Sequence, residues 1–227
     1  GLIMLQSCLN EEKGPAIYVV PDNYLVKQVI DEAKRLGISA TEDKDDYSYS
    51  NSKAILVTSI QTIVNGYSYF GMSEGGNYPI GSIIIDDVHA CMDKIISQFM
   101  IKIDAESDAY KELIAIFSSS LKDYNPKNYI DIVEMKDCRK KMLVPYWEWQ
   151  RQQDNIYRIL TKYDNSKNSA IYFGLPLIER SLETSDCIIT ASAIEISPKG
   201  IDLDKISSLE EASRRIYMSA TLADDSV

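Results

Sequence analysis

The densest set of chemically capable side chains directly follows a run of three isoleucines. Asp86 and Asp87 come after Ile83–Ile85, and His89, the only histidine of the chain, lies two positions further on. Such a run is typical of a strand buried on both faces of a parallel sheet, and open parallel sheets carry their chemistry at the carboxyl ends of their strands. Two carboxylates there suit a hydrated Mg²⁺, which takes one or two carboxylates together with phosphate oxygens. In a plainer interpretation, Asp86 or Asp87 only caps the helix expected from residue 88 to about 97.

Polar residues also follow three other apolar runs that are expected to be strands. The runs and the residues after them are 16–20 with Pro21, Asp22, Asn23 and Tyr24; 54–57 with Thr58 and Ser59; and 215–218 with Ser219, Ala220 and Thr221. Helical patterns follow the first two, with Asp22 as a cap and Gly37 as a stop signal for the first helix. Strands that alternate with helices predict a right-handed parallel α/β sheet. Thr58 and Ser59 fit equally well as simple helix caps.

Composition narrows the classes of function. With 24 basic and 34 acidic residues the net charge is −10, which argues against binding nucleic acid by bulk electrostatics but leaves room for a local groove. The four cysteines lie far apart with no Cys-x-x-Cys pair, so we expect reduced thiols in a cytoplasmic protein rather than a zinc or iron–sulfur site. No apolar run approaches the roughly 18–20 residues of a membrane span, and no signal peptide is visible, so no membrane partner is expected.

The pattern changes between residues 92 and 212, where we predict a mixed, mostly helical insertion. Helices are expected over 107–122, 145–163 and 208–212, and short strands over 99–103, 170–175, 187–190 and 193–196. Within this insertion, the stretch from Lys136 to Arg151 combines basic and aromatic residues: Arg139, Lys140, Lys141, Tyr146, Trp147 and Trp149. Stacking aromatics with nearby cations would suit single-stranded nucleic acid. The plainer alternative places Trp149 in a core stripe and the lysines on a solvated face.

In their order, the four strand-end groups resemble motifs Ia, Ic, II and III of the first RecA-like domain of superfamily 2 helicases, the DEAD/DEAH-box group. The box Asp86-Asp87-Val88-His89 and the triplet Ser219-Ala220-Thr221 are the specific matches, whereas Pro21-Asp22-Asn23 and Thr58-Ser59 are weak alone. The resemblance covers roughly residues 1–91 and 213–222. It implies a RecA-like parallel sheet flanked by helices, of the P-loop NTPase type, in residues 1–91 and 213–227, with 92–212 inserted between motifs II and III.

The resemblance also implies roles for individual residues. Asp86 would hold Mg²⁺ on the phosphates of ATP, Asp87 would polarise the attacking water, and His89 would couple the box to its surroundings. Ser219 and Thr221 would link the nucleotide state to closure against a second RecA-like domain. The sugar–phosphate backbone of DNA or RNA, most simply single-stranded, would be contacted by Pro21, Asp22, Asn23, Tyr24, Thr58 and Ser59.

Two departures from the family pattern affect the expected activity. Asp87 stands where the family usually has Glu, and no Gly-x-x-x-x-Gly-Lys-Ser/Thr phosphate loop occurs in the chain. We therefore expect the loop just upstream of residue 1 and the second RecA-like domain beyond residue 227, so that this fragment alone is inactive. The predicted function is that of part of an ATP-dependent helicase or translocase. The alternatives are a catalytically inactive relative, whose insertion mediates protein or nucleic-acid interaction, and a phosphate-loop ATPase that is not a helicase.

Overall fold

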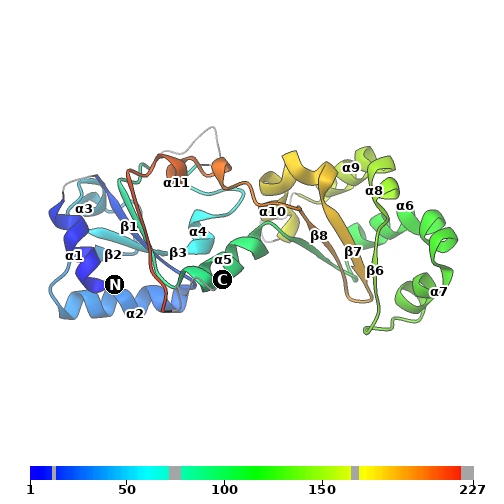
Figure 1. Cartoon of the computed structure of the whole chain (residues 1–227), viewed down its shortest axis with the longest axis horizontal. Coiled ribbons are helices and arrows are strands. Elements are labelled where there is room, and N and C mark those ends of the chain that lie inside the picture. Colours follow the sequence, from blue (N-terminus) through cyan, green and yellow to red (C-terminus); the bar gives the residue numbers. More distant parts are fainter. Residues whose placement is uncertain (12–13, 72–77, 165–168, 221–227) are drawn as a thin grey trace, which may run out of the picture. The chain divides into compact units, whose positions relative to one another are not determined.

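The chain forms two compact units in the computed structural model, which describes residues 1–11, 14–71, 78–164 and 169–220 (Figure 1). Unit 1 comprises Gly1–Ser97 and Asp202–Val227, and unit 2 comprises Gln98–Ile201. The bounds of unit 2 thus lie inside the interval 92–212. The helix that follows Asp87 belongs to unit 1 for nearly its whole length, because Cys91 and Ile95 on its inner face are buried there.

Unit 1 is built on a five-stranded parallel sheet with the strand order β2-β3-β1-β4-β9. Its strands are β1 Ala16–Val20, β2 Ala40–Thr41, β3 Ile55–Ser59, β4 Ser82–Ile85 and β9 Arg214–Tyr217. All four neighbouring pairs are parallel. The central strands β1, β3 and β4 are buried along their whole length, as their uninterrupted apolar runs predict for a sheet covered on both faces. The expected parallel α/β sheet is confirmed.

Helices cover both faces of this sheet (Figure 1). They are α1 Leu2–Asn10, α2 Asn23–Arg35, α3 Tyr47–Ser50, α4 Ile60–Ile63, α5 Val88–Gln98, the 3-10 turn η3 Leu203–Lys205 and α11 Ser207–Glu211. As predicted, Asp22 caps α2 by accepting hydrogen bonds from two main-chain N–H groups. Gly37 follows the end of α2 at φ +73°, a conformation that glycine adopts without strain. The short helix α3 lies between β2 and β3, and Asp46 caps it.

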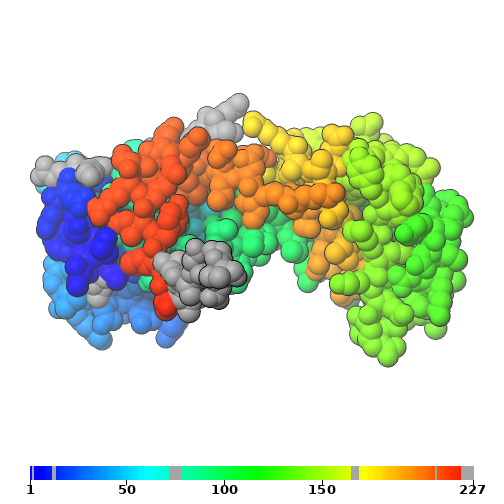
Figure 2. Space-filling view, in the orientation of Figure 1, coloured from blue at the N-terminus to red at the C-terminus, as the bar shows by residue number. Residues whose placement is uncertain are grey.

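The two faces of the sheet pack against different elements. Leu5 of α1 and Val26 of α2 share one apolar core with Tyr18 and Ile84, whereas Ile83 and Ile85 point to the opposite face because side chains alternate along a strand. The edge strand β9 is joined to α1 by an ion pair between Arg214 and Glu11. Figure 2 shows this C-terminal segment, coloured orange to red, at the surface of unit 1 beside the blue N-terminal helix.

Unit 2 contains a four-stranded antiparallel sheet with the order β5-β8-β7-β6 and a set of helices. The strands are β5 Ile101–Asp104, β6 Lys141–Leu143, β7 Asp186–Thr190 and β8 Ala193–Ser197. The helices are α6 Asp108–Tyr124, α7 Pro126–Tyr129, η1 Ile130–Glu134, α8 Tyr146–Arg151, α9 Gln153–Tyr163, α10 Ala170–Ile178 and η2 Glu179–Thr184. No helix among the described residues is both long enough and apolar enough to cross a membrane.

Several elements of unit 2 differ from the sequence predictions, and α7, η1, β6 and η2 lie where no element was expected. Residues 170–175, predicted as a strand, begin α10, whose buried Ile171, Leu175 and Ile178 recur at helical spacing behind a Ser169 cap. Gly174 lets this helix approach β5, because a Cβ there would lie 2.8 Å from Cγ1 of Ile101. The single helix expected over 145–163 is divided at residue 152 into α8 and α9.

A buried carboxylate holds α8 against α6. Glu148 is 1% exposed and accepts hydrogen bonds from the Ser120 hydroxyl (2.6 Å), the Arg151 guanidinium (2.6 Å) and the Gln152 amide (3.1 Å). Burial by itself raises the pKa of Glu148, but these hydrogen bonds outweigh it, and the net pKa lies below the ordinary value. Trp149 beside it is buried, so the plainer alternative, a core stripe, holds for this tryptophan.

Candidate functional site

Four polar strand ends meet at one edge of the parallel sheet. The register aligns Val20 with Ser59, Val19 with Ile85, and Ile85 with Tyr217. The residues that follow β1, β3, β4 and β9 therefore leave the sheet at the same edge, in the spatial order β3, β1, β4, β9. The structure thus brings together the strand ends that the sequence pattern singled out, and it does so because parallel strands share the direction of their carboxyl ends.

Asp86 is the best-anchored polar residue of this edge. Its main-chain N–H extends the sheet by donating to the Val19 carbonyl at 2.9 Å. Its carboxylate accepts the Asp87 N–H on Oδ1 at 3.0 Å and the Tyr18 hydroxyl on Oδ2 at 2.6 Å. The side chain is half-buried, and each oxygen keeps a further lone pair for another ligand. Asp86 therefore does not cap α5.

Tyr18 is a part of this site that the sequence interpretation missed. It lies in the middle of β1, is 2% exposed, and its hydroxyl lies against Gly1 at the start of α1 as well as Asp86. Burial, and then the hydrogen bond to the Asp86 carboxylate, raises the pKa of Tyr18. A signal was present in the sequence, because a tyrosine within an otherwise aliphatic buried strand must find a partner for its hydroxyl.

Asp87 forms the sharp turn between β4 and α5. Its backbone has φ +46°, in the left-handed region that non-glycine residues seldom occupy and that recurs at functional turns. The carboxylate is exposed, and its Oδ1 lies 3.5 Å from the Ala90 N–H, a long contact of the kind made by a weak helix cap. His89 lies exposed in the first turn of α5. Asp87 and His89 can therefore both be reached from solvent.

The end of β9 is hydrogen bonded to the box. The Met218 N–H donates to the Ile85 carbonyl, and the Val88 N–H donates to the Met218 carbonyl, both at 2.9 Å. Ser219, the first residue of the triplet, follows directly and is half-buried. Thr221 lies outside the described residues. A displacement of the β9 end would therefore be transmitted to the start of α5 through the main chain.

The residues that follow β1 and are predicted to contact nucleic acid differ in their exposure to solvent. Pro21 is buried, whereas Asp22, Asn23 and Tyr24 are exposed at the N-terminus of α2. Asp22 Oδ1 is already used as the cap, accepting from the N–H groups of Tyr24 and Leu25 at 3.0 and 3.2 Å. Asn23 and Tyr24 thus present the accessible side chains of this group.

Thr58 and Ser59, expected to follow a strand over 54–57, are instead the last two residues of β3 and are buried. Thr58 and Ser59 are 8% and 2% exposed, and the Ser59 hydroxyl lies 3.2 Å from the Thr62 hydroxyl. The Ser59 side chain makes no capping hydrogen bond to α4. A ligand at this edge would therefore reach the main chain here more readily than either hydroxyl.

The carboxylates of this edge fit a hydrated Mg²⁺ better than a closed metal centre. Nowhere in the described parts of the chain do three His, Cys, Asp or Glu side chains gather as potential metal ligands. Asp86 and Asp87 would supply at most two carboxylates, which is what Mg²⁺ takes from a protein when phosphates and waters complete its shell. Cys91 lies behind them, and burial, followed by the charges of Asp87 and Asp86, raises the pKa of its thiol to about 12.

Comparison with known proteins identifies the fold. No family model and no curated protein match the chain. Its structure is similar to that of S. tokodaii Xpd4, with a TM-score of 0.51 and 14% sequence identity, and the match covers 98% of this chain. The match therefore extends over both units. The chain spans about half (51%) of the length of Xpd4. This similarity, with the five-stranded parallel sheet, supports the predicted RecA-like α/β fold.

Proposed function

We propose that this chain is the first ATPase domain of an ATP-dependent helicase or translocase of the DEAD/DEAH-box-like group, acting on DNA or RNA. The main support for the proposal is the box Asp86-Asp87-Val88-His89, which lies at the carboxyl end of β4. The Val88 N–H of this box donates a hydrogen bond to the carbonyl of Met218, the residue before Ser219. The RecA-like α/β fold supports it.

In this proposal each acid of the box has its own task. Asp86, held by Tyr18 and the Asp87 N–H, is the carboxylate that faces Mg²⁺ on the nucleotide. Asp87, exposed on its left-handed turn, accepts the proton of the attacking water. Phosphoryl transfer depends mainly on positioning and charge neutralisation, so fixed carboxylates are what such a site needs from this edge. His89 and Ser219 couple the nucleotide state to movement.

The remaining parts of the motor are proposed to lie outside this sequence. A phosphate loop would precede Gly1, the residue before α1, which lies against the Tyr18 hydroxyl and hence close to Asp86. A second RecA-like domain would follow β9. Nucleic acid would run along the carboxyl edge, contacting Asn23 and Tyr24 through their exposed side chains and Ser59 through its main chain. Residues 98–201 would be inserted between the box and the third motif.

The direct test measures ATP hydrolysis by the full-length protein, with and without single-stranded DNA or RNA, for the wild type and Asp87→Asn. Loss of a general base lowers turnover by about 10²–10⁴-fold, so this loss is expected together with stimulation by one of the two polymers. Asp93→Asn is the matched control, because Asp93 is exposed on the same helix and should leave turnover unchanged. The 227-residue chain alone should not hydrolyse ATP.

The other outcomes separate the competing proposals. Turnover that depends on Asp87 but ignores both polymers would identify a phosphate-loop ATPase that is not a helicase. Turnover that survives Asp87→Asn would refute the assigned role of this carboxylate. No turnover with either polymer would leave the second candidate, a catalytically inactive scaffold.

One surface feature favours an interaction role for unit 2. Tyr124 and Trp147 form an exposed edge-to-face pair with ring centroids 5.5 Å apart, and Tyr146 beside Trp147 is 66% exposed. Residues 98–201 also hold 14 of the 24 basic residues of the chain, including Lys140 and Lys141. Exposed aromatic rings suit base stacking, which contributes about 1–3 kcal/mol per base, and the basic residues of the unit would attract the nucleic-acid backbone.

This second candidate is tested by Trp147→Ala and Lys140→Ala in strand-binding measurements on the full-length protein. Loss of one stacked base should weaken binding about 5- to 150-fold for Trp147→Ala. Tyr157→Ala, also an exposed aromatic of unit 2 but outside this pair, is the control. Unchanged strand affinity in both variants would remove nucleic acid as the ligand of this surface and favour a protein partner.

A further inference from the structure

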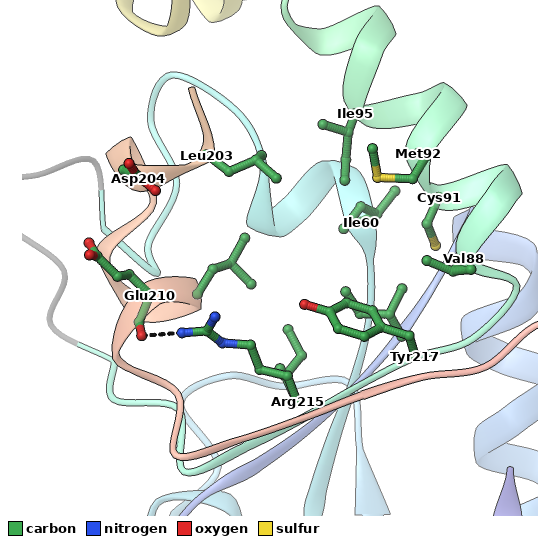
Figure 3. A pocket seen from close by; sticks show the side chains of 13 residues that line it. Ile60, Val88, Cys91, Met92, Ile95, Leu203, Asp204, Glu210, Arg215 and Tyr217 are labelled. Carbon is green, nitrogen blue, oxygen red and sulfur yellow. Dashed lines mark hydrogen bonds between the residues drawn. The ribbon is translucent and has the colours of Figure 1, made fainter. Parts of the chain in front are cut away.

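Unit 1 contains a cavity of about 310 Å³ on the face of the sheet opposite α1 and α2. Figure 3 shows it between α5 on one side and the segment of η3 and α11 on the other, with β4 and β9 as the floor. Its volume falls at the lower end of the range for small-molecule sites, about 300–1,000 Å³. The lining residues that the structure describes all belong to unit 1.

The inner wall of the cavity is aliphatic and preformed. Ile83 and Ile85 project from β4, Cys91 and Ile95 from α5, and Ile60 from α4, and all five are at most 7% exposed. These side chains are fixed by the sheet and by a helix of three turns, so an apolar group entering the cavity would displace only water. Such a wall accepts a compact apolar body such as an aromatic ring.

The mouth of the cavity is polar and carries more negative than positive charge. Asp204 and Glu210 supply two exposed carboxylates, and Arg215 supplies one guanidinium. Arg215 donates to the main-chain carbonyl of Glu210, as Figure 3 shows, and not to either carboxylate. Neither carboxylate makes an ion pair with any residue that the structure describes.

Charge complementarity therefore favours a cationic ligand. Among the described lining residues, the two carboxylates outnumber the single guanidinium, and the net charge of −10 on the chain repels anions at long range. The Tyr217 ring lies at the same mouth and offers a face to a cation or to an aromatic group. An anionic ligand would have to overcome all of these features.

We propose that this cavity binds a small organic cation whose apolar body, about the size of a fused aromatic ring, enters between α5 and β9 while its ammonium group faces Asp204 and Glu210. The inference goes beyond the ATPase proposal and does not depend on it. The ligand would contact α5, which directly follows Asp87, and β9, which ends two residues before Ser219, so its binding would affect the carboxyl edge of the sheet.

The test measures binding of 1-naphthylmethylamine to the 227-residue chain by calorimetry and ligand-observed NMR, with the neutral 1-naphthalenemethanol as the matched ligand. The amine should bind saturably and more tightly than the alcohol. The double variant Asp204→Asn/Glu210→Gln should weaken amine binding about two- to tenfold, as expected for two solvent-exposed ion pairs, and leave alcohol binding unchanged. Met92→Trp, which places a bulky ring at a partly exposed position of the lining, should abolish binding of both.

Asp93→Asn is the control on α5, since Asp93 does not line the cavity, and far-UV circular dichroism shows whether each variant keeps its fold. Absence of saturable binding up to roughly millimolar amine would overturn the proposal. So would equal affinity for amine and alcohol, or binding that Met92→Trp leaves intact. None of these outcomes bears on ATP hydrolysis, so failure here is distinguishable from failure of the proposed function.

Discussion

Replacing Tyr18 with phenylalanine removes a single oxygen atom from the centre of the candidate site. The ring would stay in place, because Tyr18 is 2% exposed and packs in the core shared by α1, α2 and the sheet. The Asp86 carboxylate, however, would lose the shorter of its two hydrogen bonds, the one of 2.6 Å, and would keep only the N–H of Asp87.

The expected loss of stability follows from the surroundings of the two groups. A hydrogen bond to a charged acceptor contributes about 1.5–3 kcal/mol to stability. Asp86 is only half-buried, so water can replace part of this interaction, and we expect Tyr18→Phe to lower the free energy of unfolding by about 1–2 kcal/mol. For a chain of this size that corresponds to a fall in Tm of roughly 2–4 °C per kcal/mol.

The assay is urea denaturation followed by far-UV circular dichroism. Tyr47→Phe is the matched control, because Tyr47 is 77% exposed and its hydroxyl makes no hydrogen bond within the described residues, so its effect should stay within about 0.5 kcal/mol. Both tryptophans, Trp147 and Trp149, lie in unit 2, so their fluorescence transition reports on the unit that the substitution does not touch.

The reasoning would be refuted if Tyr18→Phe were as stable as Tyr47→Phe, since the Tyr18 hydroxyl would then contribute nothing to holding Asp86. A shift confined to the tryptophan signal would also contradict it. In the full-length protein, the proposed role of Asp86 adds a second expectation, that Tyr18→Phe raises the Mg²⁺ concentration needed for half-maximal ATP hydrolysis.

Three further predictions concern other parts of the chain. The pKa of Glu148 is lower in the folded chain than in the unfolded chain. The carboxylate therefore stabilises the fold fully above the ordinary pKa of about 4.3, and this contribution is lost as the pH falls below that value. Glu148→Gln should remove this part of the acid sensitivity, as thermal unfolding measured between about pH 6 and 3 would show. Gly174→Ala should destabilise the chain by about 1–3 kcal/mol in urea, whereas Gly200→Ala, with no neighbour within 4 Å, should not. Iodoacetamide should modify exposed Cys138 in the native chain and spare buried Cys91, as mass spectrometry of the peptides would show.

Each of these predictions has a clear contrary result. An unchanged acid transition in Glu148→Gln would mean that its hydrogen bonds do not depress the pKa enough to matter. Equal stability of the two alanine variants would mean that Ile101 moves aside freely. Alkylation of Cys91 as fast as Cys138 would show that α5 opens readily from the sheet.

The order and type of most elements of unit 1 were predictable from local pattern. The apolar runs 16–20 and 83–85 became central strands, and Asp22 and Gly37 mark the ends of α2, because strand burial and helix capping are decided by a few neighbouring residues. The segment 170–175 was predicted wrongly, since an apolar run of six residues fits a strand and a buried helix equally well. The close packing of this segment against β5 at Gly174 favours the helix.

The sequence alone determined that the two carboxylates and Ser219 follow strands, and the parallel register then had to bring those strand ends to one edge. Only the tertiary structure decided which of these groups are anchored and which are accessible. It buries Thr58 and Ser59, leaves Asn23 and Tyr24 exposed, and joins Tyr18 to Asp86 across 68 positions of the chain. The physical reason is that a pattern of residue types determines which face of an element is apolar and where the element ends. Hydrogen-bond partners and solvent access depend instead on the neighbouring element that packs against it.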